Sequence, residues 1–341
     1  MKIGILGGGQ LARMLALAGH PLGFEFVVLD PTEDACAASV AEQVIGAYDD
    51  QKMLEQFAES SDVVTYEFEN VPAESVRYLT GKVPVYPSPD ALAVSRDRLL
   101  EKNMFRELGI STPEYAAVDS LEDLKEAVSK IGLPAVLKTR TLGYDGKGQA
   151  VLHSTEEIEP AWSQLKSVPC ILESFVPFTR EISIMAVRGR NGETVFYSVS
   201  ENTHRGGILH LSVSKPGDQM QHKAEEYSRK LLKRLDYVGV LGLELFDADG
   251  TLLANEIAPR VHNTGHLTIE GAQTSQFENH IRAVTGLPLG NTSARGFSAM
   301  VNFIGEIPDA ASVLRIRNAH FHNYGKKPRK GRKLGHVTVC A

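Results

Sequence analysis

Residues 133–149 read LPAVLKTRTLGYDGKGQ and carry the most informative pattern in the chain. The apolar run that ends at Lys138 predicts a buried strand, and a lysine at a strand end can hold a nucleotide phosphate as a point charge. The glycines Gly143, Gly146 and Gly148 predict a loop that folds over phosphates and excludes water. An ordinary glycine-rich hairpin explains this loop equally well when the loop is considered alone.

Two glutamates stand in apolar surroundings further along the chain. Glu244 lies within LGLELF and Glu256 within LLANEI, and the dipeptide Asp249-Gly250 between them predicts a β-hairpin over residues 239–257. A carboxylate in an apolar strand needs a cation or a partner, and hard oxygen ligands suit a Mg²⁺ ion that bridges nucleotide phosphates. A solvated surface is the alternative for two isolated glutamates.

A polar turn, APRVHNTGH, follows the hairpin directly. Arg260, His262 and Asn263 on this turn predict a clamp for an oxyanion and for one edge of a substrate. A zinc site built on His262 or His266 is not predicted, because the sequence offers no third ligand at a suitable spacing.

Residues 324–333, YGKKPRKGRK, are strongly basic in a chain whose net charge is −6. A solvated tail or a nucleic-acid patch is one explanation of such a run. The glycines and the proline within the run, and the apolar-flanked LGHVTV after it, indicate an ordered loop instead. An ordered cationic loop in an acidic protein favours a phosphate ligand.

The N-terminal stretch GGGQLA, residues 7–12, fits the pattern G-x-G-x-x-A between a predicted strand at residues 2–6 and a predicted helix at residues 10–18. Asp30 follows at the end of a second predicted strand. This arrangement is typical of nucleotide binding at a helix N-terminus, and NAD is the first candidate cofactor. A tight strand-to-helix turn that needs only the backbone freedom of glycine is the other interpretation.

The order of the predicted elements divides the chain near residue 95. Before it, strands alternate with helices, which predicts a parallel sheet of the α/β class. After it, a helix over residues 95–109 leads into a more antiparallel region. The other elements predicted in the two regions are helices at residues 47–60 and 276–285 and strands at residues 24–29, 62–66, 135–138, 170–175, 181–187 and 194–200.

Composition limits the class of protein. A chain of 341 residues with 43% hydrophobic and 23% charged residues is typical of a globular protein with two or three domains. The acidic balance argues against nucleic-acid partners, and three scattered cysteines favour a reducing compartment. Neither a signal peptide nor a membrane span is predicted. We therefore expect a cytoplasmic protein that binds small molecules, no nucleic acid and no membrane.

Taken together, these patterns resemble the ATP-grasp superfamily and, within it, most closely the 5-(carboxyamino)imidazole ribonucleotide synthases of purine biosynthesis. The resemblance covers essentially the whole chain, in the order GGGQLARM, TYEFENV, SRDRLLEK, LKTRTLGYDGKGQ, LESFVPFTREIS, ENTHRGGI, GLELF, ANEIAPRVHNTGH and GRKLGHV. Each motif alone is weak, whereas nine in sequence are specific. The resemblance implies a multidomain α/β (α+β) protein with an ATP-grasp fold. Its domains would be a Rossmann-like N-terminal domain at residues 1–95, an ATP-grasp domain at residues 96–289 with a lid at about residues 118–178, and a small β-rich C-terminal domain at residues 290–341.

The resemblance assigns residues to ATP. Arg96 and Lys138 would meet the phosphates, and Glu181 would take the ribose hydroxyls with His204 nearby. The residues that would bind adenine through the backbone are Glu173, Ser174, Phe175 and Val176. The residues that would cover the phosphates are Gly143, Tyr144, Asp145, Gly146, Lys147, Gly148 and Gln149.

The resemblance also implies a metal ion and a second substrate. Glu244 and Glu256 would hold Mg²⁺. Relatives such as biotin carboxylase have Asn two residues after the second glutamate, where this chain has Ala258, so a water or Asn255 would complete the metal ligands. The residues implied for an imidazole ribonucleotide, in place of NAD at the glycine turn, are Gln10, Leu11, Glu67, Asn263, Lys326, Arg332 and Lys333.

The implied reaction is a carboxylation in two steps. Bicarbonate attacks the γ-phosphate of ATP to give carboxyphosphate and ADP, and the exocyclic amine of 5-aminoimidazole ribonucleotide then captures carboxyphosphate or CO₂ released from it. Lys138 and Arg260 would neutralise the charge on the transferring group. Asp145 would orient or deprotonate the amine, unless it serves only to form the turn.

The resemblance implies a homodimer as well. Three alternatives stay open at this point: a formate-dependent glycinamide ribonucleotide transformylase, an NAD-dependent oxidoreductase built on the glycine turn, and a nucleotide sensor without turnover. The stretches ENTHRGG and PRVHNTGH favour the carboxylase over the transformylase.

Overall fold

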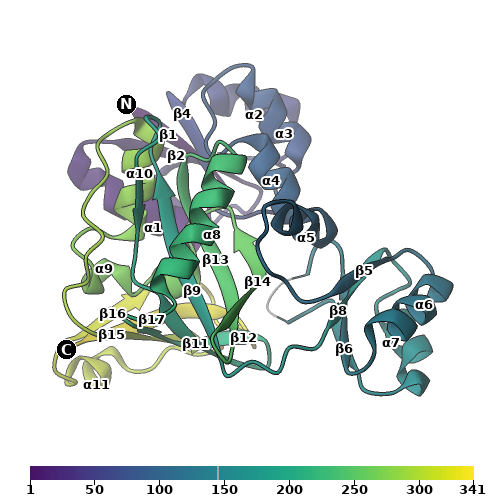
Figure 1. Cartoon of the computed structure of the whole chain (residues 1–341). Helices are drawn as coiled ribbons and strands as arrows, with labels where there is room; N and C mark the ends of the chain where they lie inside the picture. The colour runs from purple at the N-terminus through teal and green to yellow at the C-terminus, as the bar shows by residue number, and fades with distance from the viewer. Residues whose placement is uncertain (144–145) are drawn as a thin grey trace.

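The computed structural model describes residues 1–143 and 146–341. Its N-terminal region is a parallel sheet covered by helices (Figure 1). The strands pair in the order β3-β2-β1-β4, and every pair is parallel. The carboxyl ends of β1 and β4 therefore meet at one edge of the sheet and bring residues 7–12 beside residues 67–70. The elements of this region are β1 (Lys2–Leu6), α1 (Gln10–Gly19), β2 (Glu25–Asp30), β3 (Glu42–Ile45), α2 (Gln51–Glu59), β4 (Val63–Tyr66) and α3 (Ala73–Thr80).

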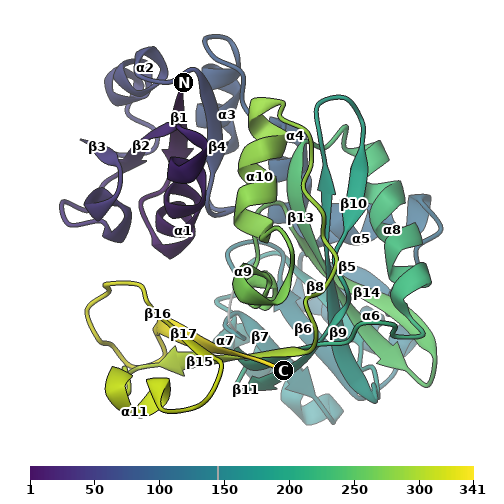
Figure 2. The same cartoon turned by 90° about the vertical axis from the view of Figure 1, so that its left-hand side faces the viewer.

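The central region is a nine-stranded sheet in which the described pairs are antiparallel. Its order is β14-β13-β9-β11-β12-β15-β17-β16, and β10 pairs with β9. The C-terminal strands thus extend the central sheet through β12, as Figure 2 shows on its lower side. The strands are β9 (Arg180–Arg188), β10 (Thr194–Phe196), β11 (Ser200–Arg205), β12 (Ile208–Ser214), β13 (Gly239–Ala248), β14 (Thr251–Ala258), β15 (Ser298–Ile304), β16 (Ala319–Asn323) and β17 (Lys333–Cys340).

A four-stranded sheet with two helices forms a separate lobe beside the central sheet (Figure 1). Its strands pair antiparallel in the order β5-β8-β6-β7, and an apolar cluster under α6 and α7 holds the lobe together. We call this lobe the lid. Its elements are β5 (Tyr115–Val118), α6 (Leu121–Ile131), β6 (Ala135–Thr139), β7 (Gln149–Leu152), α7 (Ile158–Gln164) and β8 (Cys170–Ser174).

Helices join and cover the sheets. Figure 2 shows α10 between the N-terminal sheet and the central sheet, and buried His280 on this helix shares a 2.8 Å hydrogen bond with Thr65 of β4. The remaining helices are α4 (Pro89–Arg96), α5 (Arg98–Glu107), α8 (Gln221–Arg234), α9 (Thr268–Gly271), α10 (Gln276–Thr285) and α11 (Ala310–Leu314). Among the described residues, no helix is long and apolar enough to cross a membrane.

Three predicted elements need correction. The helix expected at residues 47–60 begins at Gln51, because the carboxylate of Asp50 caps it by accepting the N–H groups of Lys52 and Met53. The helix expected at residues 95–109 is two helices, because Asp97 leaves the helical conformation and caps α5 in the same way. The strand expected at residues 194–200 is broken after Phe196.

The cause of that break is a local change of partner. Tyr197 N–H still donates to the carbonyl of Met185 on β9, but the N–H of Val199 donates to the side chain of Gln221, and the chain pairs regularly with β9 again at Ser200. The hairpin β13–β14 and the bounds of α10 agree with the sequence patterns. The patterns did not predict β3, α3, α6 or α8.

Candidate functional site

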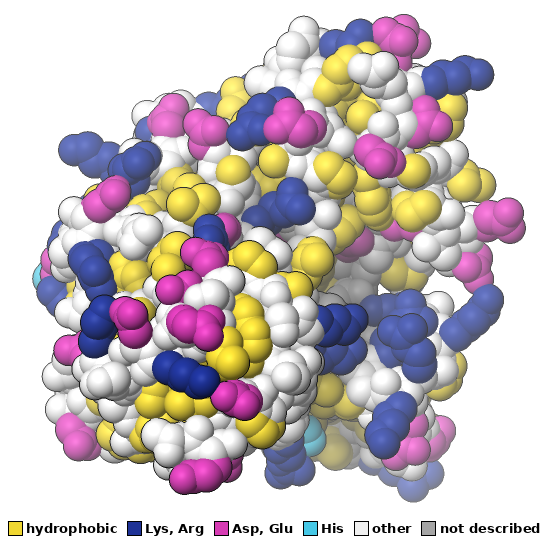
Figure 3. Space-filling model, turned by 90° about the vertical axis from the view of Figure 1, so that its right-hand side faces the viewer, with side chains coloured by type: hydrophobic (Ala, Val, Ile, Leu, Met, Phe, Trp, Pro, Cys, Tyr) yellow, Lys and Arg dark blue, Asp and Glu magenta, His cyan; other side chains and the backbone are white. Residues whose placement is uncertain are grey.

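A cleft of about 820 Å³ opens between the N-terminal sheet, the lid and the central sheet. Figure 3 shows a hollow on this face, with Lys and Arg side chains gathered on one side of it. The predicted ligand-binding residues that line the cleft are Gln10, Leu11, Glu67, Arg96, Gly143, Lys147, Glu256, Arg260, Asn263, Lys326, Arg332 and Lys333.

The other predicted residues lie around this lining. They stand on or next to strands of the lid and of the central sheet: Lys138, Gly146, Gly148, Gln149, Glu173, Ser174, Phe175, Val176, Glu181, His204, Glu244 and Asn255. Tyr144 and Asp145, for which we predicted roles in covering the phosphates and handling the amine, lie outside the described residues.

The two predicted metal ligands face one another across a hairpin. In the register of β13 and β14, Glu244 is the direct cross-strand partner of Glu256. The register shifts beside this pair, because Leu245 pairs with Ala254 and the intervening Asn255 has no partner on β13. This is a β-bulge, which bends the strand and changes the direction of a side chain. The bulge therefore lies directly at the carboxylate pair.

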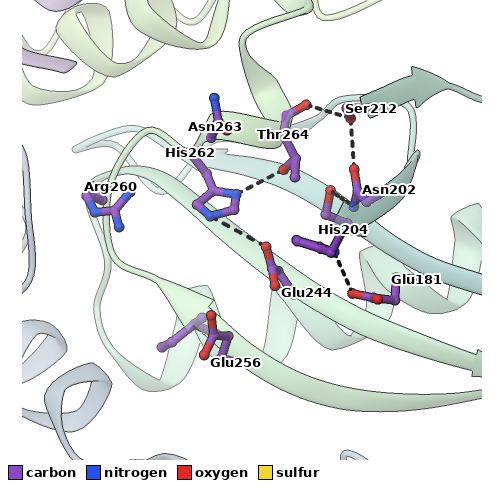
Figure 4. A network of polar contacts seen from close by, with 12 residues as sticks. Glu181, Asn202, His204, Ser212, Glu244, Glu256, Arg260, His262, Asn263 and Thr264 are labelled. Carbon is purple, nitrogen blue, oxygen red and sulfur yellow. Dashed lines mark hydrogen bonds and ion pairs between the residues drawn. The ribbon is translucent and has the colours of Figure 1, made fainter. Parts of the chain in front are cut away.

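The surroundings set the two carboxylates to different charge states. Burial and the neighbouring carboxylate of Glu256 raise the pKa of Glu244 to about 7. Burial opposes ionisation of Glu256 too, but the Arg98 guanidinium, whose Nη1 lies 2.8 Å from its Oε2, outweighs burial and lowers the pKa of Glu256. In Figure 4, His262 faces Glu244, with Nε2 3.5 Å from Oε1. Burial and Arg260 lower the pKa of His262 to about 3, so this imidazole is neutral.

The donor set fits a hard cation that brings its own anionic ligands. Two buried acceptors near the pair, Asn255 Oδ1 and Glu173 Oε1, have no hydrogen-bond partner among the described residues. The described residues contain no group of three or more His, Cys, Asp or Glu that could hold a metal alone. Oxygen donors in this number suit Mg²⁺, which usually combines one or two carboxylates with substrate phosphates and water.

Lys138, Lys102 and Glu173 form a buried group of ion pairs between the lid and α5. Lys138 near the end of β6 donates from Nζ to Glu173 Oε2 at 2.9 Å, and Lys102 of α5 lies 3.4 Å from the same oxygen. Burial opposes the charge on Glu173, but the two lysines outweigh burial and lower the pKa of this carboxyl to about 2. Lys138 is thus held by Glu173 and also acts electrostatically on Glu256.

Arg98 is a residue of the site that the sequence patterns did not single out. Arg96, which the resemblance assigns to phosphate, donates from Nη1 to the carbonyl of Val71 at 2.9 Å. Arg98 instead reaches Glu256, and a Cβ added at Gly143 would stand 3.3 Å from its Nη2. Arg98 therefore links β14 to the start of the glycine loop. The signal that was available is its place in the motif SRDRLLEK, directly after the capping residue Asp97.

The glycine loop returns to the central sheet at its far end. Gly146 and Gly148 have φ of +73° and +72°, a region that favours glycine. A Cβ at Gly146 would stand 2.9 Å from the Cα of Gly207, so the loop rests on the turn between β11 and β12. Gly143 thus lies beside Arg98, and Gly146 lies beside that turn.

The residues expected around adenine and ribose lie where the lid meets the central sheet. The N–H groups of Ser174 and Phe175 donate to the carbonyls of Glu114 and Pro134, and Phe178 stacks on Phe246 with ring centroids 4.8 Å apart. This stack provides an apolar platform beside the strand end.

Glu181 of β9 and His204 of β11 form an ion pair next to that platform. Nδ1 of His204 lies 2.9 Å from Oε2 of Glu181, as the dashed line in Figure 4 marks. Burial alone would lower the pKa of His204, but the carboxylate of Glu181 outweighs it and raises this pKa. His204 therefore fixes the carboxylate that the resemblance assigns to the ribose hydroxyls.

The N-terminal glycine turn has its N–H groups occupied by the protein itself. Gly8 N–H donates to Asp30 Oδ2 at 2.8 Å, and the buried carboxylate of Glu67 accepts the N–H groups of Gly9 and Ala12. The helix N-terminus thus already binds a carboxylate of its own chain, and Asp30 is turned toward the backbone. The NAD fingerprint requires both groups to be available to a dinucleotide, so the geometry contradicts NAD binding here.

The basic run is an ordered loop that crosses to this turn. Lys326 Nζ donates to Gln10 Oε1 at 2.7 Å, and Lys327 pairs with Asp34 at 2.6 Å. Arg332 donates to the carbonyl of Lys327 at 3.1 Å, which closes the loop on itself. Also in the cleft lining, although the sequence patterns gave them no separate role, are Arg329, Lys330 and Gly331.

The polar turn after β14 connects the two halves of the cleft. Arg260 Nε donates to Glu69 Oε2 at 2.6 Å. The amides of Asn263 and Asn302 of β15 bond reciprocally, at 3.1 and 2.7 Å. Asn263 is therefore held in one orientation by a C-terminal strand. The arrangement as a whole combines a carboxylate pair, several fixed cations and a glycine loop, which suits transfer of a phosphoryl group near a second anionic substrate.

Family models match three consecutive parts of the chain. Residues 1–96 match the ribonucleotide synthetase preATP-grasp domain, residues 103–277 the ATP-grasp domain, and residues 298–341 the phosphoribosylaminoimidazole carboxylase C-terminal domain.

Individual relatives match over the full length. The chain is 59% identical over 342 residues to the N5-carboxyaminoimidazole ribonucleotide synthase of Pseudomonas aeruginosa, across 100% of this chain and 95% of that protein. It is 56% identical to the solved N5-carboxyaminoimidazole ribonucleotide synthetase of Thermus thermophilus, with a TM-score of 0.96 over 99% of this chain and 93% of that one. The N5-carboxyaminoimidazole synthase of Aspergillus clavatus, solved with ADP and 5-aminoimidazole ribonucleotide, is 31% identical with a TM-score of 0.93, over 100% of this chain and 93% of that one.

Proposed function

The chain belongs to the N5-carboxyaminoimidazole ribonucleotide synthase family of ATP-grasp enzymes, and from this premise we propose how its cleft performs the reaction. It is an ATP-dependent, ADP-forming ligase that carboxylates 5-aminoimidazole ribonucleotide to N5-carboxyaminoimidazole ribonucleotide in purine biosynthesis. The observation that supports the proposal most is the opposition of Glu244 and Glu256 across the β13–β14 hairpin, because Glu256 lines the same cleft as Arg98 and the basic loop.

The first step joins bicarbonate to phosphate. A bicarbonate oxygen attacks the γ-phosphorus of ATP, the bond to the β-phosphate oxygen breaks, and ADP and carboxyphosphate form. Lys138, Arg98 and Arg260 neutralise charge on the transferring group, because all three are cations held by carboxylates at the edge of the cleft. Glu244 and Glu256 would hold a Mg²⁺ ion, which would supply further positive charge to the phosphates.

The second step joins the carboxyl group to nitrogen. The exocyclic amine of the ribonucleotide attacks the carbon of carboxyphosphate, or CO₂ released from it; phosphate leaves and the nitrogen loses a proton. We assign the substrate phosphate to Lys326, Arg332 and Lys333, and its imidazole side to Gln10 and Asn263. The glycine loop excludes water that would otherwise hydrolyse carboxyphosphate.

The proposal also covers the domain boundaries, the oligomeric state and location, and the partners of the protein. The domains run over residues 1–95, 96–289 and 290–341, the protein is a cytoplasmic homodimer, and its partners are small molecules only. A separate measurement of the mass in solution tests the dimer.

An omission assay tests the function. ADP release should require ATP, Mg²⁺, bicarbonate and 5-aminoimidazole ribonucleotide together, because the cleft activates bicarbonate only through phosphoryl transfer. Each component is left out in turn, and formate replaces bicarbonate in a further reaction. Turnover with formate and glycinamide ribonucleotide would favour the transformylase, and NADH oxidation without ATP would restore the oxidoreductase.

Glu244→Gln is expected to stabilise the ligand-free chain at pH 8. The folded pKa of Glu244, about 7, lies above its ordinary value of 4.5, so the stability that its protonation contributes is lost as pH rises from about 4.5 to 7. Gln has no charge to bury and escapes this loss. The gain in Tm over the original chain should be ~2–4 °C larger at pH 8 than at pH 5, the scale of about 2 kcal/mol in a protein of this size. Equal gains in Tm at both pH values would show that burial and Glu256 do not raise the pKa of Glu244.

A further inference from the structure

One face of α5 is directed at four consecutive residues of the metal-binding strand. Arg98, Glu101 and Lys102 are three and four positions apart, so they project from the same side of the helix. Each forms a hydrogen bond or an ion pair within residues 254–257 of β14. Glu101, for example, accepts the N–H of Ile257 at 2.7 Å. A single helix thus holds the whole segment around the bulge.

Lys102 has the most complete set of partners on this face. Its Nζ lies 2.8 Å from the carbonyl oxygen of Asn255, 3.1 Å from that of Ala254 and 3.4 Å from Glu173 Oε2. An ammonium group has three N–H donors; here the group donates to two carbonyl oxygens and forms an ion pair with Glu173. The side chain is 1% exposed, so water does not substitute for any of the three. A buried ion pair of this kind is weak evidence for a purely stabilising role.

The hydrogen bonds of Lys102 to β14 act on the bulge. Asn255 has no cross-strand partner on β13, so its carbonyl group depends on another donor, and Lys102 provides it. The next residue is Glu256, whose backbone direction follows from that of Asn255. Fixing the carbonyl groups of Ala254 and Asn255 therefore fixes where the Glu256 carboxylate points.

The ion pair of Lys102 with Glu173 acts on the lid. Glu173 Oε2 accepts a hydrogen bond from Lys138 at 2.9 Å and forms an ion pair with Lys102 at 3.4 Å, so both lysines act on one carboxylate. Without Lys102, Glu173 would hold Lys138 alone and more strongly, and less of the Lys138 charge would be available to a phosphate. Lys102 thus contacts both the metal-binding strand and the partner of Lys138.

We propose that Lys102 is a positioning residue of the phosphoryl-transfer step: it directs Glu256 through the bulge in β14 and leaves Lys138 available through Glu173. The proposal rests on the function proposed above for Glu256 and Lys138. Lys102 itself contacts neither substrate nor metal. Residues that orient metal ligands in this way typically contribute 10- to 100-fold to metal affinity or activity.

The test compares ADP binding with and without Mg²⁺, measured by calorimetry, in the full-length chain and in Lys102→Met. Met keeps the length of the side chain and removes its charge and donors. The factor by which Mg²⁺ tightens ADP binding should fall about tenfold or more in the variant, and kcat should fall by about 10- to 100-fold. The KM for the ribonucleotide should stay unchanged, since Lys102 is remote from the basic loop. Lys125→Met, which removes an exposed ion pair with Glu159 on the lid, should match the original chain in all three constants.

Three outcomes separate the possible failures. If Lys102→Met keeps both the Mg²⁺ factor and kcat, whatever its Tm, the positioning role is wrong. If the original chain shows no Mg²⁺ effect on ADP, the assignment of Glu244 and Glu256 fails instead. If the Met variant does not fold, Lys102→Gln, which retains two N–H donors without charge, replaces it, and original values of the Mg²⁺ factor and kcat in that variant contradict the proposal.

Discussion

Glu256→Gln is expected to lower kcat by about 10²- to 10⁴-fold, because a catalytic metal contributes several kcal/mol to the transition state and each 1.36 kcal/mol is a factor of about ten. The amide offers one neutral oxygen where the carboxylate offers two charged ones. It also releases Arg98, whose guanidinium now pairs with Glu256 at 2.8 Å. Turnover is measured over a range of Mg²⁺ concentrations, and the loss should be largest where Mg²⁺ is limiting.

The control for this variant is Glu226→Gln. Glu226 lies on α8, where it pairs with Lys223 and Lys230 away from the cleft, so its loss should leave kcat unchanged. Circular dichroism checks that both variants keep the fold. Unchanged turnover of Glu256→Gln at limiting Mg²⁺ would mean that Glu256 serves only as the structural partner of Arg98.

Arg332→Ala is expected to raise the KM for 5-aminoimidazole ribonucleotide by roughly 30- to 150-fold, which corresponds to the ~2–3 kcal/mol of a charge-assisted hydrogen bond left unmade. The KM for ATP should stay close to its original value. The reason is position: Arg332 belongs to the loop that crosses to Gln10, whereas the residues assigned to ATP lie on the lid and the central sheet, apart from Arg96 on α4.

Lys327→Ala is the matched control in the same loop. The Lys327 ammonium pairs with Asp34 on the surface, and the Lys327 side chain is 84% exposed. Removing this side chain should therefore change either KM by no more than about twofold to fivefold, which is the scale of an exposed ion pair. A rise in the KM for ATP alone would contradict the assignment of the loop. No change in either constant for Arg332→Ala would reduce residues 326–333 to surface charge.

Local patterns were sufficient wherever the sequence has a period or a turn signal. The hairpin that opposes Glu244 and Glu256 follows from two apolar runs around Asp249-Gly250, and the ends of α10 follow from Ser275 and Gly286. These signals act over a few residues, so they do not depend on the rest of the molecule.

Charged residues on α5 show where such reasoning ends. In SRDRLLEK, Arg98, Glu101 and Lys102 look like the solvated face of a helix, because charged side chains are usually exposed. The structure buries Glu101 and Lys102 to 2% and 1% exposure, since α5 packs on β14, which lies far along the chain. No local pattern distinguishes a buried charged face from a solvated one.

Residue types and their order were enough to identify the chemistry of this protein: a lysine at a strand end, a glycine loop, paired glutamates and a basic loop, in the order typical of one family. How these parts are used became visible only in the folded chain. Asp30 and Glu67 turn inward to the glycine turn, and Lys326 meets Gln10 across 316 positions. The physical reason is that hydrogen-bond partners for buried charges come from whichever elements pack against them, and packing depends on the whole fold rather than on neighbouring residues.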